Sequence, residues 1–473
     1  MNVIHLSAEC YPVAKVGGLG DVLGALPKYQ CLSGLKASVV MPYYDRKFVR
    51  ENDFEVVYEA ASNLGNRPFN FQILKERTNK LGFPLYLVHI PGLLGREEVY
   101  AYNDETEQFV AYQLAFLDWM VQTPKKPDVI HCHDHHSGLV PFLISHSGRY
   151  RNLSAIRTVC TIHNGQYQGW FGWNKISYLP EIDLTMTGLL DWGGCINPLA
   201  TAVKCCDMFT TVSPSYLEEL SINSNGLEHL FQMEKVKGRG IINGIDMEVW
   251  DPGTDQMIVN NYTADSLKKG KFKNKKLLCH EFGLAVKKPL FAFIGRLVSE
   301  KGSDLLPEII AKSLLTHKNK INFIVLGSGE HVVENKLKKL YHGRHKNYNV
   351  FIGYDEMLSH RIYAGADFLL MPSRVEPCGL NQLYSMRYGT MPMVRRTGGL
   401  KDTVVDFDTP KGYGITFEEA SIENVCEAVD RAVKLYADET KLDTLQKRMM
   451  CLDFSWNTSA KQYINLYKSL KHL

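Results

Sequence analysis

Short apolar runs rich in β-branched and aromatic residues alternate with helical patterns along this chain, and the alternation starts again in the second half. Such alternation is typical of parallel sheets, because neighbouring parallel strands need a crossover connection that is usually a helix. The 473 residues also exceed what one ordinary core holds. The sequence therefore predicts the α/β class, with two Rossmann-like, doubly wound parallel-sheet domains. The strands that we expect lie at 3–7, 37–41, 129–133, 158–163 and 209–212, and at 290–295, 322–327, 349–353, 368–372 and 392–395. The helices that we expect include 19–26, 138–145, 304–315, 330–340, 357–364 and 379–388.

Turn-forming residues gather near the middle of the chain, in Asn243-Gly244-Ile245-Asp246 and Asp251-Pro252-Gly253. We therefore expect an N-terminal domain of residues 1–245 and a C-terminal domain that begins at 246. Two facing domains of this kind place the carboxyl ends of both sheets, where ligands bind in open α/β folds, along one central cleft. The lysine-rich stretch 268–276 is interpreted as a solvated helix face.

Charge and cysteine usage exclude several classes of protein. The 54 Lys and Arg residues nearly balance the 51 Asp and Glu residues, which argues against a surface that coats nucleic acid but permits a local basic pocket for a small anion. The 11 cysteines follow no paired framework, so we expect buried thiols in a reducing compartment. The chain opens on a strand-like segment, and no apolar run approaches ~18 residues. We therefore expect a cytoplasmic protein without a signal peptide or membrane span.

A glycine-rich loop follows the first expected strand and leads into a helix. Gly17 and Gly18 permit backbone N–H groups to approach an anion, the helix N-terminus adds a favourable dipole, and Lys15 adds charge. The loop has neither the spacing of a P-loop nor that of a dinucleotide fingerprint. Two interpretations stay open, an anion cradle or a turn that packs a helix on the sheet.

Two cations and one acid follow strands of the second half. Arg296 ends one strand and Lys301 comes five residues later, so both can converge on one phosphate unless they are ordinary solvated surface. Glu376 lies just before an expected helix, where it either faces the cleft or caps the helix. The N–H groups of 378–380 then point at a ligand, and the Thr397-Gly398 turn repeats the first glycine loop. The two glycine turns, together with Arg296 and Lys301, suit a pyrophosphate.

Two other patterns could indicate a cofactor or metal site, but in each case we favour a structural interpretation. Gly327-Ser328-Gly329 follows a strand, but a dinucleotide fingerprint needs glycine where Val332 stands, so we expect a tight turn. The histidine-rich segment 131–136 could place two imidazoles on one face of a strand, yet we interpret it as a polar lining rather than a metal site. His163-Asn164 is a similar strand end. Tyr167 and Trp170 follow it, suited either to stacking on sugar rings or to buried packing.

Taken together, these motifs resemble the bacterial glycogen synthase and plant starch synthase family of retaining glucosyltransferases, which have the GT-B fold. The resemblance runs nearly end to end. It rests on Lys15-Val16-Gly17-Gly18-Leu19, His133-Asp134-His135-His136, Thr161-Ile162-His163-Asn164, Val212-Ser213-Pro214, Asn243-Gly244-Ile245-Asp246, Gly295-Arg296 with Lys301-Gly302, residues 373–380 and residues 395–400. The family also implies a C-terminal domain of 246–455 and a last helix, 456–473, that crosses back to the N-terminal domain.

The resemblance implies transfer of glucose from ADP-glucose to the non-reducing 4-OH of an α-1,4-glucan, with retention and with neither metal nor cofactor. The catalytic residues that it implies are Glu376, Arg296, Lys301 and His163. The donor-binding residues that it implies are Lys15, Gly17, Gly18, Asp21, Asn164, Asn243, Tyr354, Cys378, Gly379, Leu380, Thr397 and Gly398. Asp134 is implied to lie near the acceptor.

Three positions depart from the family pattern, all in the acceptor-facing half: His135 replaces a usual tryptophan, Leu94 a usual tyrosine and Gln108 a usual arginine. They leave the glucan contacts open. UDP-glucose also stays open as the donor, because a stacked tyrosine does not distinguish adenine from uracil. A related GT-B enzyme with another acceptor and a non-catalytic glucan-binding protein stay open as well. We expect no nucleic-acid or membrane partner.

Overall fold

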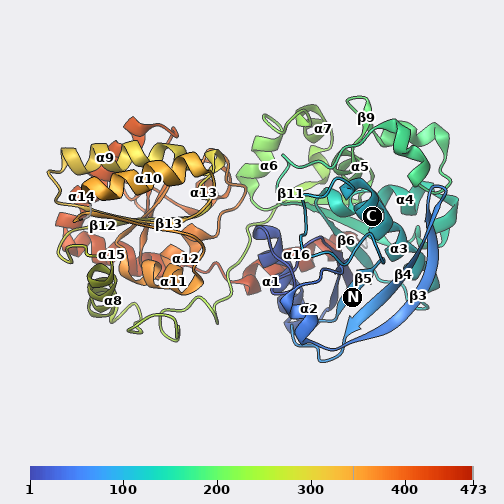
Figure 1. Ribbon diagram of the computed structural model, residues 1–473, viewed down its shortest axis with the longest axis horizontal. Coiled ribbons are helices and arrows are strands. Elements are labelled where there is room, and N and C mark those ends of the chain that lie inside the picture. Colours follow the sequence, from blue (N-terminus) through green and yellow to red (C-terminus); the bar gives the residue numbers. More distant parts are fainter. Residues whose placement is uncertain (345, 471–473) are drawn as a thin grey trace. The chain divides into compact units, whose positions relative to one another are not determined.

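The computed structural model describes residues 1–344 and 346–470. The chain divides into two compact units (Figure 1). Unit 1 contains residues 1–243 and the C-terminal segment from Trp456, and unit 2 contains residues 244–455. Each unit is an α/β domain built around its own sheet, which confirms the predicted fold class. That the two sheets face each other across a cleft stays a prediction.

Unit 1 is built on a nine-stranded sheet in the order β11-β10-β7-β6-β1-β2-β5-β4-β3. The seven strands from β11 to β5 are parallel, and β4 and β3 add an antiparallel hairpin at one edge. The strands are β1 (Asn2–Leu6), β2 (Lys36–Pro42), β3 (Phe54–Leu64), β4 (Arg67–Glu76), β5 (Leu85–His89), β6 (Val129–His133), β7 (Arg157–Ile162), β10 (Met208–Thr211) and β11 (Gly238–Gly240), with a separate pair β8 (Asp191–Trp192) and β9 (Cys195–Ile196).

The helices of unit 1 are α1 (Gly18–Leu32), α2 (Lys47–Glu51), α3 (Glu105–Gln122), α4 (Val140–His146), α5 (Pro198–Cys205), α6 (Pro214–Leu220), α7 (Glu228–Met233) and α16 (Trp456–Ser469). Helix α1 runs beyond the predicted range 19–26. It continues through Pro27, which cannot donate to the carbonyl of Leu23, and the Sγ of Cys10 donates to that carbonyl instead, at 3.3 Å. Helix α16 packs on α1, and the hydroxyl of Tyr467 bonds Gln30 at 3.1 Å.

Unit 2 is built on a six-stranded, wholly parallel sheet in the order β14-β13-β12-β15-β16-β17. The strands are β12 (Leu290–Ile294), β13 (Asn322–Gly327), β14 (Tyr348–Ile352), β15 (Phe368–Met371), β16 (Met391–Arg395) and β17 (Ile415–Phe417). The helices are α8 (Leu267–Glu281), α9 (Leu306–Thr316), α10 (His331–Arg344), α11 (Glu356–Gly365), α12 (Asn381–Arg387), α13 (Gly398–Thr403), α14 (Ile422–Ala437) and α15 (Glu439–Met450).

Helices cover both faces of this second sheet, as Figure 1 shows. Successive side chains of β12 point to opposite faces, so Phe291 joins one hydrophobic core and Ala292 the other. On the first face, the ring of Phe291 stacks on Phe323 of β13 and on Phe368 of β15. Burial on both faces explains why these strands appear in the sequence as continuous apolar runs.

The lysine-rich helix departs from the prediction. Lys271 and Lys275 of α8 are buried, with 5% and 4% of their surface exposed, so the interpretation of 268–276 as a solvated face is wrong for these two residues. The ammonium of Lys271 donates to three backbone carbonyls and a threonine hydroxyl, and that of Lys275 pairs with Asp367 at 2.6 Å. Burial lowers the pKa of Lys271 to about 7. Carbonyls from distant segments therefore decide which lysines are buried, and a local charge pattern cannot reveal them.

The order of strands reverses once in each sheet. In unit 1 the chain extends from β1 through β2 and β5, then returns to the other side of β1 with β6. In unit 2 the same reversal lies between β12 and β15. Ligands of open α/β sheets bind at the carboxyl ends of the strands at such a switch point. The segments that follow β1, β6, β12 and β15 hold Lys15, Asp134, Arg296 and Glu376, respectively.

No helix among the described residues is both long and apolar enough to cross a membrane. All eleven cysteines are described, and each carries a free thiol. Cys451 is exposed, against the expectation of buried thiols, whereas the others are buried or half-buried.

Candidate active site

Glu376 and Lys301 form a close ion pair at the switch point of unit 2. The Nζ of Lys301 lies 2.7 Å from Oε1 and 2.8 Å from Oε2 of Glu376, and the hydroxyl of Ser373 donates to Oε2 at 3.0 Å. Glu376 is buried and Lys301 half-buried. No side chain caps the N-terminus of α12, so Glu376 is not the helix-capping acid that the sequence left open. Helix α12 begins at Asn381, two residues later than predicted.

Two loops are held together so that this pair can form. A Cβ on Gly302, which has φ of +66°, would lie 2.2 Å from the carbonyl oxygen of Pro372, so only glycine permits the approach. The backbone N–H of Arg374 donates to the carbonyl of Glu300 at 2.8 Å, and its guanidinium pairs with Asp304. The loops after β12 and after β15 therefore form one assembly at the carboxyl edge of the sheet.

Arg296 lies on the same edge but has a different partner. Its guanidinium is 3.6 Å from the carboxylate of Glu300, and most of its side chain is exposed. Lys301, by contrast, faces Glu376. The structure therefore places the two cations next to two different carboxylates. Their convergence on one phosphate stays a prediction that requires side-chain movement or a bound anion.

The glycine turn after β16 contacts the backbone of Glu376. The N–H of Gly399 donates to the carbonyl of Glu376 at 3.1 Å, and a Cβ on Gly398 would lie 2.1 Å from the same oxygen. The N–H of Gly399 is therefore bonded within the protein, and an anion cradle at Thr397 and Gly398 stays a prediction. The turn fixes the backbone that carries the carboxylate.

The other expected donor contacts of unit 2 also follow the carboxyl ends of strands. Tyr354 lies just after β14 with an 80% exposed side chain, which leaves its ring accessible for stacking. Gly379 has φ of +74°, a left-handed conformation that places it before α12 rather than inside it. The remaining expected contacts lie in the same loops: Cys378 and Leu380 after β15, and Thr397 after β16.

In unit 1, the glycine loop is organised by Glu9, which the sequence analysis did not identify. Oε2 of this buried carboxylate accepts the N–H groups of Val16 at 2.6 Å and Gly17 at 2.9 Å, and Oε1 accepts the hydroxyl of Tyr100 at 2.7 Å. The N–H of Gly17 therefore has an internal acceptor, and its expected contact with the donor stays a prediction. A buried acid between a strand and a glycine-rich loop is the signal that could have revealed Glu9.

The donor is also expected to contact Lys15, Gly18 and Asn243 of unit 1. Lys15 pairs with Asp21 of α1 at 2.7 Å. A Cβ on Gly18 would meet no atom within 4 Å, so the backbone there borders open space. Asn243 is buried, and its Oδ1 has no hydrogen-bond partner among the described residues. An unpartnered buried amide oxygen is costly, which is consistent with a polar group that binds there.

Asp134 joins the ends of β6 and β7. Its Oδ1 accepts the backbone N–H of His163 at 2.7 Å and that of Asn164 at 3.5 Å. The backbone of Asp134 has φ of +53° and ψ of −168°, a combination that residues with a Cβ rarely adopt. Strain of this kind persists where neighbouring structure enforces it, and it gathers at functional sites.

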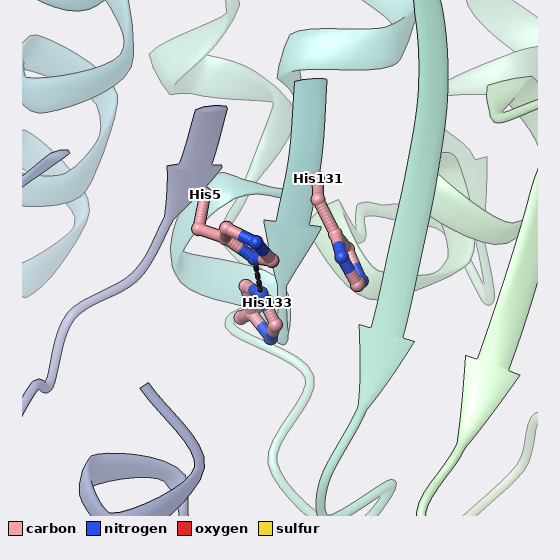
Figure 2. Close-up of side chains that lie close together, drawn as sticks. All are labelled: His5, His131 and His133. Atoms are coloured by element: carbon pink, nitrogen blue, oxygen red, sulfur yellow. Dashed lines mark hydrogen bonds between the residues drawn. The ribbon is translucent and has the colours of Figure 1, made fainter. Parts of the chain in front are cut away.

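A group of buried histidines lies on the neighbouring strands β1 and β6 (Figure 2). His5 of β1 and His131 and His133 of β6 hold ligand atoms within 4.8 Å of one another. Nδ1 of His5 bonds Nε2 of His133 at 3.0 Å, and Nδ1 of His133 bonds Nε2 of His163 at 2.9 Å. Nε2 of His5 bonds Oε1 of Gln30. His131 bonds Oη of Tyr467 through Nδ1 and Oγ1 of Thr161 through Nε2.

This hydrogen-bonded chain favours the polar interpretation of segment 131–136. A metal ion would have to displace bonds that use both nitrogens of each of the three imidazoles. Burial lowers the pKa of His163 to about 3 and that of His5 to about 4, so the rings stay neutral and can both donate and accept. The chain fixes the ring of His163 at the end of β7.

Asp134 provides a pH-dependent test of this arrangement. Burial raises the pKa of its carboxyl from 3.8 to about 7, so between these values the folded chain holds a proton that the unfolded chain has lost. The free energy of unfolding should therefore fall as pH rises through this window, and more steeply in the wild type than in Asp134→Asn. The amide keeps an acceptor for the N–H of His163 but does not titrate.

The measurement is urea unfolding of both proteins between about pH 4 and pH 8. Tryptophan fluorescence reports mainly unit 1, because unit 2 contains a single tryptophan, Trp250. A stability difference that stays constant across this range would contradict the raised pKa.

Comparisons with known proteins cover both units. The family described as the starch synthase catalytic domain matches residues 2–233, and the family described as glycosyl transferases group 1 matches residues 276–448. A glycogen synthase of Flavobacterium johnsoniae is 54% identical over 99% of this chain and 98% of its own length. A glycogen synthase of Streptococcus sanguinis is 35% identical over 99% of this chain and 100% of its own length.

Solved structures agree with these matches. The catalytic domain of starch synthase IV from Arabidopsis thaliana, bound to ADP and acarbose, superposes with a TM-score of 0.89, is 32% identical and covers 99% of both chains. A sucrose-phosphate synthase from Thermosynechococcus elongatus, with a TM-score of 0.61 and 16% identity over 100% of this chain and 99% of its own, shares the fold.

Proposed function

This chain belongs to the glycogen synthase and starch synthase family of glucosyltransferases, and on that premise we propose that it extends α-1,4-glucans with glucose from ADP-glucose, retaining the anomeric configuration. The observation that carries the proposal is the full-length identity of 54% to a glycogen synthase. The structural relative bound to ADP supports an adenine nucleotide as the leaving group. The partners are then a nucleotide-sugar donor and a glucan acceptor, and a cytoplasmic location stays a prediction.

The proposed chemistry is a displacement at C1 of the donor glucose. The bond from C1 to the diphosphate oxygen breaks with its electron pair on the diphosphate, and O4 of the acceptor forms the new bond to C1. The proton of the 4-OH leaves with the departing diphosphate. Negative charge thus grows on the diphosphate while C1 becomes oxocarbenium-like, so fixed cations near the diphosphate stabilise the transition state more than the ground state.

We assign the roles by charge. Lys301, and Arg296 after it turns from Glu300, bind the departing diphosphate. Glu376 orients Lys301 and offsets positive charge at C1. A covalent intermediate would need a carboxylate nucleophile and a second acid/base. Tyr384 stands eight residues after Glu376, where related retaining families carry a second glutamate. This supports attack and departure on one face of the sugar.

The decisive experiment supplies purified protein with ADP-glucose or UDP-glucose, with and without glycogen, and measures both nucleotide release and glucose incorporation. We expect glycogen-dependent release of ADP that matches incorporation. ADP release that is indifferent to glycogen, without chain extension, would contradict the proposal. Faster transfer from UDP-glucose would make UDP-glucose the assigned donor and would leave the reaction class unchanged.

A further inference from the structure

The loop after β7 presents two aromatic rings to solvent. Trp170 is 63% exposed and Tyr167 is 55% exposed, whereas Gln168 and Phe171 of the same loop are buried. Of the two fates that the sequence permitted for these aromatics, the structure therefore excludes buried packing. The burial of such large aromatic side chains by a ligand contributes favourable free energy.

The loop is anchored on both sides of Trp170. The side chain of Gln168 accepts a hydrogen bond from Asn197 at 2.8 Å and donates to the carbonyls of Ser224 and Asn225. The N–H and carbonyl of Phe171 both pair with Ile196, each at 2.9 Å. The backbone that carries the ring is thus ordered before a ligand arrives, which reduces the entropic cost of binding.

The same loop is joined to the candidate active site. The N–H of Tyr167 donates to the carbonyl of Asn164 at 3.3 Å, and Nδ1 of His135 bonds the carbonyl of Tyr167 at 3.1 Å. Gly169 has φ of +67°, and a Cβ there would lie 2.2 Å from the ring of His135. The loop is therefore held between the residues that directly follow Asp134 and His163.

We propose that Trp170 and Tyr167 form a docking surface for the α-1,4-glucan acceptor, stacking on glucose units beyond the one that reacts; this rests on the proposed function. The C–H faces of pyranose rings pack on aromatic faces while their hydroxyl groups stay in contact with water. Gly169, Gly172 and Asn174 are the exposed neighbours. None of the three has a large apolar side chain, which suits a hydroxylated chain better than the apolar core of a protein interface.

The inference also accounts for His135, one of the departures from the family pattern. Its ring is packed under the loop, 3.8 Å from the ring of His136. The imidazole there supports the loop through Gly169 and Tyr167.

The test is Trp170→Ala, compared with Trp170→Phe and with Phe272→Ala, which removes a similarly exposed aromatic side chain (54%) from unit 2. Electrophoresis through gels that contain glycogen, without donor, measures binding alone. We expect Trp170→Ala to weaken glycogen binding about tenfold and to raise KM for glycogen equally, with kcat and KM for ADP-glucose little changed. Trp170→Phe should keep most of the affinity, and Phe272→Ala all of it.

The outcomes separate this inference from the proposed function. If the wild type extends glycogen but Trp170→Ala binds it with wild-type affinity, the docking surface is wrong and the function stands. If the wild type incorporates no glucose but its glycogen binding depends on Trp170, the function fails and the surface stands. Should Trp170→Ala unfold at a lower temperature than the wild type, Tyr167→Ala decides by the same measurements.

Discussion

Lys301→Met is expected to lower kcat at least ~100-fold, with KM for glycogen little changed. The ammonium is one of the cations assigned to the departing diphosphate, and Glu376 already holds it in place at 2.7 Å. A cation at ~4 Å from a phosphate charge contributes about 4 kcal/mol at an effective dielectric of ~20. A ~100-fold loss corresponds to about 2.7 kcal/mol of transition-state stabilisation, so this single contact is sufficient. Initial rates of ADP release and glucose incorporation at saturating donor and glycogen give the result.

A matched control comes from the same unit. Lys312 also forms an ion pair, with Glu423 at 3.7 Å, but it lies on α9 and both side chains are exposed. Lys312→Met should keep wild-type kcat, because Lys312 lies outside the loops of the candidate site. The fold should also be unaffected, because exposed ion pairs contribute little to stability. Near-wild-type turnover in Lys301→Met would show that this lysine does not contact the leaving group.

The fold could be predicted where burial is continuous along the chain. The strands β12 and β13 are covered on both faces, so residues 290–294 and 323–326 are unbroken apolar runs that are visible without any structure. The hairpin of β3 and β4 was missed for the converse reason. Much of Phe54–Leu64 is exposed or half-buried, and its order depends on antiparallel pairing with Arg67–Glu76. Pairing between segments leaves no apolar run in either one.

The residues of the candidate site could likewise be predicted only in part. Lys301 and Glu376 were found because strand ends, cations and carboxylates can be identified along one chain. Groups whose roles depend on tertiary contacts could not be found in this way. Glu9 organises Val16 and Gly17 through bonds across a loop, and the buried Lys271 depends on carbonyls about ninety or more positions away. Such contacts are set by tertiary packing, which one sequence does not encode locally.

Glu376→Gln is expected to lower kcat at least ~100-fold while the fold stays intact. The amide keeps the size of the side chain and can still accept from Ser373, now 3.0 Å from Oε2, but it lacks the negative charge that orients Lys301 and offsets charge at C1. Steady-state rates measure the loss, and thermal unfolding checks the fold. Wild-type turnover in this variant would remove Glu376 from the mechanism.

The double variant Lys301→Met/Glu376→Gln separates catalysis from stability. Lys301→Met alone leaves a buried carboxylate without its cation, which is costly, whereas the double variant leaves no charge at this site. The double variant should therefore unfold at a higher temperature than Lys301→Met but remain at least ~100-fold slower than the wild type. If turnover recovered together with stability, the ion pair would be structural, and the chemistry would have to be assigned to other residues of the site.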